Sequence, residues 1–142
     1  MTSNRPYYTL LNHTADMGIR VWGHTLAELF EHAARALTEI LLKERPSQKE
    51  SLYRLSIAGE DPSDLLVRWL GEILYLLEGE DMVVVDISID AMTETRLDAR
   101  LYVAPFDPKK HEVLTEIKAV TYHQIEVVRE RNGWRASVIF DL

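Results

Sequence analysis

The chain has 142 residues, a formal net charge of −7, an apolar fraction of 46% and no cysteine. Its length predicts one domain, residues 1–142, and the lack of cysteine excludes disulfides, thiolate nucleophiles and Cys-ligated metals. The acidity disfavours direct nucleic-acid binding, which needs Lys and Arg to neutralise phosphates, and favours a metal ion or a basic protein partner. We find no signal peptide and no bilayer-spanning run, so we expect no membrane association and a cytoplasmic location.

The first part of the chain predicts a strand at residues 7–10, a polar bend at 12–18 and a second strand at 19–22. The bend brings together the imidazole of His13, a hydroxyl and the carboxylate of Asp16. Gly18 suits such a bend, because glycine reaches positive φ without steric cost.

The next stretch predicts a core helix. Thr25 and Glu28 have the spacing of a capping box, in which each side chain accepts a backbone N–H of the first turn. The apolar residues that follow recur at helical spacing and form one stripe: Leu26, Leu29, Phe30, Ala33, Leu37, Ile40 and Leu41.

A strand at 53–57 ends at Gly59, and a second helix begins with Asp61 as its cap and Pro62 at its first position. Its apolar stripe is wider than that of the first helix, so we expect deeper burial. Gly79 is a suitable C-terminal stop.

The second half of the chain predicts antiparallel strands. Residues 82–89 place Val83, Val85, Ile87 and Ile89 on one face, and residues 97–103 continue the alternation. After a charged loop, a hairpin turns at Asn132-Gly133, the pair favoured for a type I′ turn.

The last strand alternates from Trp134 to Phe140, so Asp141 should point away from the core that holds Phe140. We find no internal repeat. Two helices among six to seven strands predict an α+β fold, with the helices packed on one side of a largely antiparallel sheet.

Three features could carry chemistry. His13 and Asp16 share the early bend, although an aspartate there commonly caps its own backbone. At the other end, the Asp141 carboxylate lies one residue from the α-carboxylate of Leu142. Together with Asp16 these oxygens would suit a hard divalent cation such as calcium or magnesium, whereas the alternative is a frayed tail.

The third feature is the segment that holds Lys118, Tyr122 and His123, which could line a polar pocket or contact an anion. The alternative is that Lys118 and His123 are solvated positions beside a strand. No nucleophile–base motif and no Gly-rich phosphate loop occurs, so the sequence is poorly equipped as an enzyme. We interpret His24 and His32 as surface residues.

Four blocks of the chain, in order, resemble the archease family. They are HTADMGIRVWGHTLAELFEHAA, the DP-x-x-H loop (Asp107, Pro108, His111), KAVTYHQIEV and GWRASVIFDL. One departure is Gln124, where many relatives carry a small residue or glycine.

The resemblance implies a small cytoplasmic activator of an RtcB-type RNA ligase, the enzyme of tRNA splicing and RNA repair. It implies that the chain promotes guanylylation of the ligase by GTP, and so multiple turnover, without catalysing ligation. The implied fold is a strand-helix-strand-strand core with a similar inserted unit.

The family's metal site, carried over to this sequence, implies Asp16, Asp141 and Leu142 as ligands, the last through a main-chain or terminal oxygen. Calcium is the expected ion, with magnesium or manganese as alternatives. His13 would orient Asp16, and Lys118, Tyr122 and His123 would lie beside the site or face the partner.

Two other functions stay open: a stand-alone metal-dependent hydrolase, in which the carboxylates help to activate water, and a chaperone-like binding module.

Overall fold

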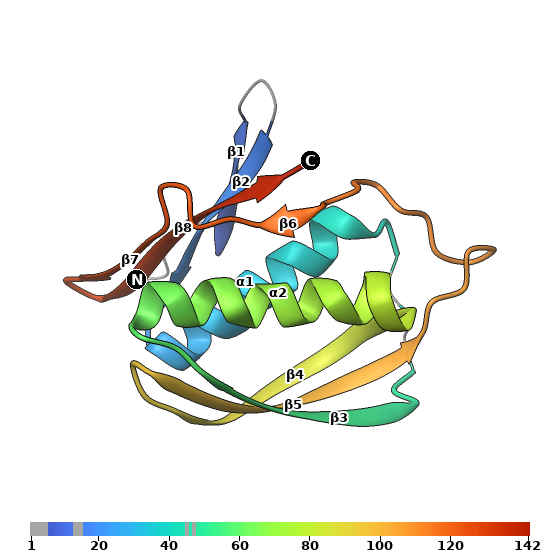
Figure 1. Cartoon of the computed structure of the whole chain (residues 1–142), viewed down its shortest axis with the longest axis horizontal. Helices are drawn as coiled ribbons and strands as arrows, with labels where there is room; N and C mark the ends of the chain where they lie inside the picture. The colour runs from blue at the N-terminus through green and yellow to red at the C-terminus, as the bar shows by residue number, and fades with distance from the viewer. Residues whose placement is uncertain (1–5, 13–15, 45, 47) are drawn as a thin grey trace.

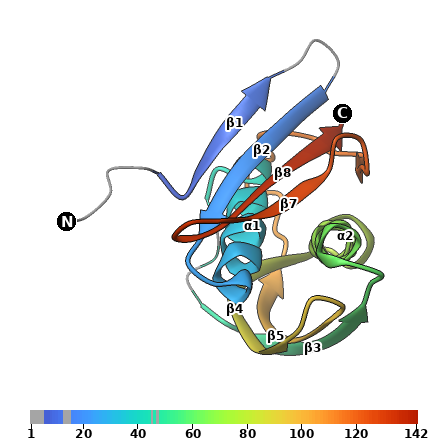
Figure 2. The ribbon, with the colours of Figure 1, turned by 90° about the vertical axis from the view of Figure 1, so that its left-hand side faces the viewer.

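The computed structural model describes residues 6–12, 16–44, 46 and 48–142. Two helices lie between two antiparallel sheets, so the molecule has three layers (Figure 1). The view turned by 90° shows the same order, with one sheet above and one below the helices (Figure 2). The α+β class is confirmed, and the helices are covered by a second sheet rather than packed on one side of a single sheet.

The first sheet holds five strands of the described chain and has the order β1-β2-β8-β6, with β7 also paired to β8. Its strands are β1 (Tyr8–Asn12), β2 (Asp16–Gly23), β6 (Ala119–Val120), β7 (Glu126–Glu130) and β8 (Gly133–Asp141). The expected bend at 12–18 is therefore shorter than predicted, because Asn12 ends one strand and Asp16 begins the next.

The second sheet has the order β3-β5-β4. Its strands are β3 (Ser51–Ala58), β4 (Met82–Met92) and β5 (Arg96–Pro105). The predicted alternation in β4 is broken by a register shift between Val84 and Asp86, so Val84 is buried while Val85 is half-buried. A β-bulge adds one unpaired residue and so moves the following side chains to the other face.

The first helix, α1 (Leu26–Leu41), begins as predicted. Thr25 Oγ1 accepts the N–H of Glu28 at 3.0 Å, while the Glu28 carboxylate reaches back one residue further than the motif requires, to the N–H of His24 at 3.2 Å. The predicted apolar stripe lies in the core, with Leu29, Phe30 and Leu37 fully buried.

The second helix, α2 (Pro62–Glu80), has the predicted Asp61 cap, which accepts the N–H of Asp64 at 2.8 Å. The predicted stop at Gly79 is wrong, because the helix continues to Glu80 and Asp81 takes the left-handed conformation (φ 53°). Gly79 instead makes room for the Tyr75 ring, whose nearest atom would lie 2.5 Å from an added Cβ.

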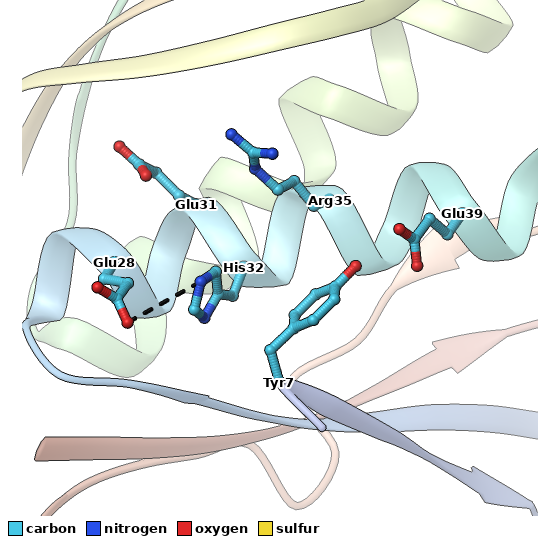
Figure 3. Close-up of a pocket in the computed structure, with 6 residues that line it drawn as sticks. All are labelled: Tyr7, Glu28, Glu31, His32, Arg35 and Glu39. Atoms are coloured by element: carbon cyan, nitrogen blue, oxygen red, sulfur yellow. Dashed lines mark ion pairs between the residues drawn. The ribbon is translucent and has the colours of Figure 1, made fainter. Parts of the chain in front are cut away.

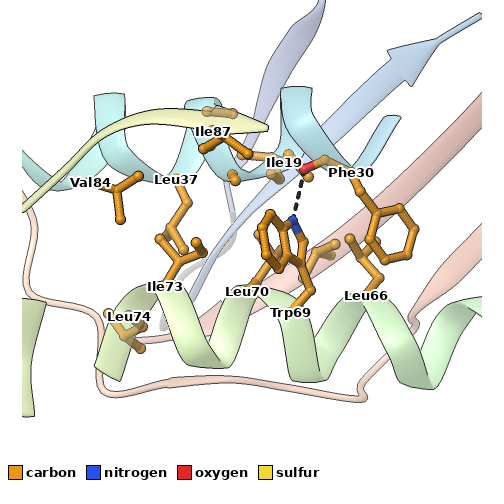
Figure 4. Packing of buried hydrophobic residues seen from close by; sticks show 14 of the residues in the cluster. Ile19, Phe30, Leu37, Leu66, Trp69, Leu70, Ile73, Leu74, Val84 and Ile87 are labelled. Atoms are coloured by element: carbon orange, nitrogen blue, oxygen red, sulfur yellow. Dashed lines mark hydrogen bonds between the residues drawn. The ribbon is translucent and has the colours of Figure 1, made fainter. Parts of the chain in front are cut away.

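The two helices meet at Trp69, which is fully buried (Figure 4). Its indole N–H donates to the carbonyl of Phe30 at 2.9 Å, so the one polar atom of this side chain is satisfied inside the core. A buried aromatic side chain of this kind stabilises a fold by about 3–5 kcal/mol relative to alanine. This contact fixes α1 against α2.

The chain contains two units of the same topology, which the residue patterns alone did not reveal and the family resemblance implied. One unit is β2-α1-β7-β8 and the inserted unit is β3-α2-β4-β5; in each, the first strand pairs with the last, and the last with the third. Gly23 and Gly59 end the two first strands in equivalent places. An added Cβ would lie 2.4 Å from Leu29 N in one unit and 2.8 Å from Leu65 N in the other.

The predicted type I′ turn at Asn132-Gly133 is also wrong. Gly133 pairs with Glu130, so the two loop residues are Arg131 and Asn132, and neither has a positive φ. Gly133 is required because its Cα lies against Gly23, where an added Cβ would be 2.3 Å from the carbonyl oxygen. The expectation for the last strand is confirmed: Ala136, Val138 and Phe140 face the helices and are fully buried.

Candidate functional site

The two predicted carboxylates lie opposite each other at the end of the first sheet. Asp16 opens β2 and Asp141 closes β8, and the register pairs them directly. Directly opposed residues of antiparallel strands point to the same face, and here it is the face turned away from the helices. Asp16 and Asp141 are therefore neighbours outside the core, as the alternation of the last strand predicted.

Asp16 has an unusual environment. Its Oδ1 atom is buried, and it is the one buried side-chain oxygen or nitrogen of the described residues that has no hydrogen-bond partner. Leaving such an atom unpaired costs about 1–3 kcal/mol, so native proteins rarely keep one without a reason. The alternative reading, that Asp16 caps its own backbone, is not supported for this oxygen.

Gly18 brings β2 and β8 together behind this pair. An added Cβ at Gly18 would lie 2.6 Å from the carbonyl oxygen of Val138 and 2.9 Å from the end of the Ile139 side chain. The sequence analysis assigned Gly18 to a positive-φ bend, but it lies within β2 and serves the close approach of the two strands. This packing buries Ile139 on the outer face, beside the carboxylates.

The other neighbour of Asp141 is the short strand β6. The N–H of Lys118 donates to the carbonyl of Asp141 at 2.8 Å, and Ala119 pairs with Asp141 in the register. Lys118 is exposed and forms no ion pair with a described residue within 4.0 Å. Its main chain therefore supports the site, while its side chain stays available to solvent.

Tyr122 and His123 follow directly. The Tyr122 hydroxyl donates to Asp64 Oδ1 at 2.6 Å, in the first turn of α2. This hydrogen bond, followed by those from the Glu60 N–H and the Arg68 side chain, lowers the pKa of Asp64 to about 2. His123 is exposed, and its backbone N–H donates to Thr121 Oγ1 at 3.2 Å.

The donor set fits a hard cation in part. Carboxylate oxygens are the ligands that calcium and magnesium prefer, and an orphaned buried oxygen is a free ligand position. Leu142 follows Asp141 at the same end of the sheet and is 39% exposed. His13 lies outside the described residues. Within the described residues, no third His, Cys, Asp or Glu side chain joins the pair.

The Asp107–His111 loop is stabilised by contacts within the loop and with the neighbouring Phe106. Its backbone N–H at Asp107 donates to His111 Nδ1 at 2.8 Å, and the His111 ring packs against Phe106 with ring centroids 5.7 Å apart. Both residues therefore serve the turn, and neither is part of the carboxylate site.

A pocket of about 310 Å³ lies elsewhere, along one face of α1 (Figure 3). Its lining residues are Tyr7, Glu28, Glu31, His32, Arg35 and Glu39. His32 was expected to be a surface residue, but it is half-buried and its Nδ1 lies 2.6 Å from the carbonyl oxygen of Trp22, which makes Nδ1 the donor. Arg35 reaches out of the pocket to Asp86 at 3.6 Å, and Glu28 caps the helix. Glu28, His32 and Arg35 thus already have local roles.

The sequence analysis missed two residues that shape the site. Nothing in the sequence indicated that Asp64, in the first turn of α2, would contact Tyr122. Thr121 donates from both its N–H (3.0 Å) and its hydroxyl (2.9 Å) to the carbonyl of Ile139. The only local signal for Thr121 was its place beside a strand.

An α+β protein with two equivalent units and a carboxylate pair at one end of a sheet matches a known family. The model of the Archease protein family matches residues 8–142. "Protein archease" of Methanosarcina barkeri is 33% identical over 146 residues, covering 100% of both chains, and that of Pyrococcus furiosus is 37% identical over 134 residues, covering 92% and 94%.

Two solved structures have the same fold. Protein 1598 of Methanobacterium thermoautotrophicum has a TM-score of 0.78 and 30% identity, covering 96% of this chain and 99% of its own. An archease described as a possible chaperone, from Thermotoga maritima, has a TM-score of 0.64 and 22% identity, covering 100% and 99%.

This chain belongs to the archease family. The inserted strand-helix-strand-strand unit expected from the resemblance is confirmed by the fold. In the part of the chain that the structure describes, neither helix has the length and apolar character required to cross a bilayer.

Proposed function

We propose that this protein activates an RtcB-type RNA ligase, promoting its GTP-dependent guanylylation and multiple turnover in tRNA splicing and RNA repair. In this role it is an accessory protein and not the catalyst. Family membership supports the proposal, and the observation that carries it is the orphaned Oδ1 of Asp16 opposite Asp141.

In this proposal Asp16, Asp141 and an oxygen of Leu142 hold a divalent cation. We expect calcium, because it accepts carboxylate and main-chain oxygens in irregular geometry, whereas magnesium demands a near-ideal octahedron; manganese is a further alternative. When bound, the cation supplies positive charge that can join the carboxylates to an acidic group such as a phosphate.

The chain's own residues position the two carboxylates and attract the partner. Pairing of β2 with β8 holds Asp16 opposite Asp141, and the Lys118 N–H fixes the Asp141 carbonyl. The formal charge of −7 attracts a basic surface such as a site that binds RNA and nucleotide, which speeds encounter with the ligase. Because the carboxylates lie at the ends of their strands and Asp141 is exposed, a partner can approach them.

The test is RNA ligation with a limiting amount of RtcB-type ligase, GTP and divalent metal, with and without this protein. We expect product to exceed one equivalent per ligase only when the protein is present. Asp16→Asn should remove the stimulation. Asp90→Asn is the matched control, because Asp90 is an acid on the other sheet that is paired with Arg100.

Other results would point elsewhere. No stimulation by the unaltered protein would overturn the activator role, and full stimulation by Asp16→Asn would overturn the role of the carboxylate site. Metal-dependent hydrolysis of RNA or nucleotide without ligase would favour the stand-alone hydrolase. Suppression of aggregation of several unrelated proteins would favour the chaperone-like module.

A further inference from the structure

The third strand of the first unit is interrupted beside the carboxylate site. β6 ends at Val120 and β7 begins at Glu126, although both pair with the same strand, β8. The residues between them loop out, with Gln124 in the left-handed conformation (φ 53°). In the inserted unit, β4 runs along the whole of β5 with two register shifts.

The interruption leaves β6 with only two residues. This short strand pairs with β8 beside Asp141, on the side away from β2. A strand this short opens locally at little cost unless other contacts fasten it. Ile117, just before it, is fully buried, and Thr121, just after it, bonds twice to the Ile139 carbonyl. The next contact along the chain is the hydrogen bond from Tyr122 to Asp64.

Asp64 is a well-fixed acceptor. Its Oδ2 accepts the N–H of Glu60 at 2.8 Å and lies 3.0 Å from Arg68 Nε, while its Oδ1 accepts the Tyr122 hydroxyl. Hydrogen bonds to an ionised acceptor are shorter and stronger than neutral ones, and the 2.6 Å distance fits that class. Because α2 belongs to the inserted unit, this contact ties the inserted unit to the segment beside Asp141.

We propose that Tyr122 is a positioning residue: through its hydrogen bond to Asp64 it fastens β6 against β8 and so holds Asp141 opposite Asp16 for cation binding. The consequence for cation binding rests on the proposed function, whereas the fastening of β6 does not. Tyr122 is not itself a ligand in this scheme, because its hydroxyl is bound to Asp64.

The test compares two phenylalanine variants of the full chain. Tyr122→Phe removes the hydroxyl that bonds Asp64, and Tyr75→Phe removes an equally exposed hydroxyl that donates to Glu80 at 2.8 Å, away from the site. Calcium affinity is measured by calorimetry well below the melting temperature. Amide hydrogen exchange is followed at Lys118 and Thr121, whose N–H groups donate to Asp141 and Ile139.

We expect Tyr122→Phe to speed exchange at both amides and to weaken calcium binding about 3- to 10-fold, below the 10- to 100-fold typical of groups that bond a ligand directly. Tyr75→Phe should change neither. Asp64→Asn should weaken calcium binding as well, and adding Tyr122→Phe to it should cause little further loss, because the two residues act through one bond.

Each failure has its own meaning. Unchanged exchange in Tyr122→Phe overturns the fastening role, whatever the metal result. Faster exchange with unchanged calcium affinity overturns the link to cation binding. If the unaltered protein binds no calcium, magnesium or manganese, the proposed metal site fails, and the exchange comparison alone still decides the fastening role.

Discussion

The two units share a topology, and one equivalent pair of positions carries opposite chemistry in the two. Asp16 lies seven residues before Gly23, and Leu52 lies seven residues before Gly59. Each faces a residue of the last strand of its unit: Asp16 faces Asp141, and Leu52 faces Tyr102. The same place in the architecture holds two carboxylates in one unit and an apolar–aromatic pair in the other.

The surroundings of the two pairs also differ. Lys49 lies 4.5 Å from the centre of the Tyr102 ring and binds Asp86 at 2.8 Å, so charge in the inserted unit is neutralised locally. Asp90 binds Arg100 in the same way, at 2.8 Å. Asp16, in contrast, keeps a buried oxygen without a partner. Asp86 and Asp90 are thus paired within the inserted unit, whereas Asp16 has an unpaired buried oxygen, the one that we propose as a cation ligand.

The largest expected effect tests the equivalence of the two units. Gly23→Ala and Gly59→Ala should each lower the free energy of unfolding by about 3 kcal/mol or more, because the new Cβ would overlap the backbone of Leu29 or Leu65. Gly71→Ala, in the interior of α2 with open space around it, is the control and should stabilise by about 0.5–1 kcal/mol. Urea unfolding measures all three, and a harmless change at Gly23 or Gly59 would contradict the equivalence.

The next effect concerns the unpaired acid. Calcium at 100 times its dissociation constant should stabilise the unaltered protein by about 2.7 kcal/mol, as for any ligand that binds only the native state. Asp16→Asn should abolish this gain, while Asp90→Asn should retain it. Thermal melts with and without calcium give the answer, and a gain that survives in Asp16→Asn would place the cation elsewhere.

A graft of one pair onto the other sharpens the comparison further. The double variant Asp16→Leu/Asp141→Tyr copies the Leu52–Tyr102 pair into the first unit. Because it replaces a buried unpaired oxygen with apolar groups, we expect it to fold and to be about 1–2 kcal/mol more stable than the metal-free protein. Calorimetry should detect no calcium binding. A loss of stability on this scale would mean that the two positions are not interchangeable.

The smallest effect is the acid dependence of the inserted unit. The hydrogen bond from Lys49 lowers the pKa of Asp86 below its ordinary value of 3.8, and that from Arg100 lowers the pKa of Asp90. A lowered folded-state pKa stabilises the fold above the ordinary value, and the gain is lost as pH falls through the folded-state pKa. Asp86→Asn should therefore make the stability curve shallower below pH 4. Urea melts at a series of pH values give this curve. If its slope below pH 4 is the same in Asp86→Asn, the ion pair contributes nothing to stability.

Local features of the fold could be predicted from the sequence because their causes are local. Thr25 and Asp61 cap their helices as expected, and the alternation of β8 put Phe140 inside and Asp141 outside. The end of α2 could not be predicted from the sequence. Gly79 was predicted as the stop because it is a glycine, whereas its role in the structure is to make room for the Tyr75 ring. Gly133 was misassigned for a similar reason: its requirement comes from Gly23, far away in the chain.

The candidate site was only half predictable. The residues alone indicated a possible cation site of Asp16, Asp141 and the Leu142 carboxylate, and the resemblance to a family supported it, but the pairing of the two aspartates depends on a strand register that no local pattern encodes. The repeat was hidden because equivalent positions carry unlike residues, such as Asp16 and Leu52. The link from Tyr122 to Asp64 was hidden because it crosses between units.

The pairing of β2 with β8 also sets the order of events during synthesis. Asp16 leaves the ribosome more than a hundred residues before Asp141, and the whole inserted unit is made in between. At about 5–20 residues per second, Asp16 waits on the order of ten seconds for its counterpart. The inserted unit has its strands close together in sequence and is expected to form first, whereas pairing across such a separation forms slowly. The carboxylate pair is thus among the last features to form, and a nascent chain cannot hold a cation there before β8 has been made.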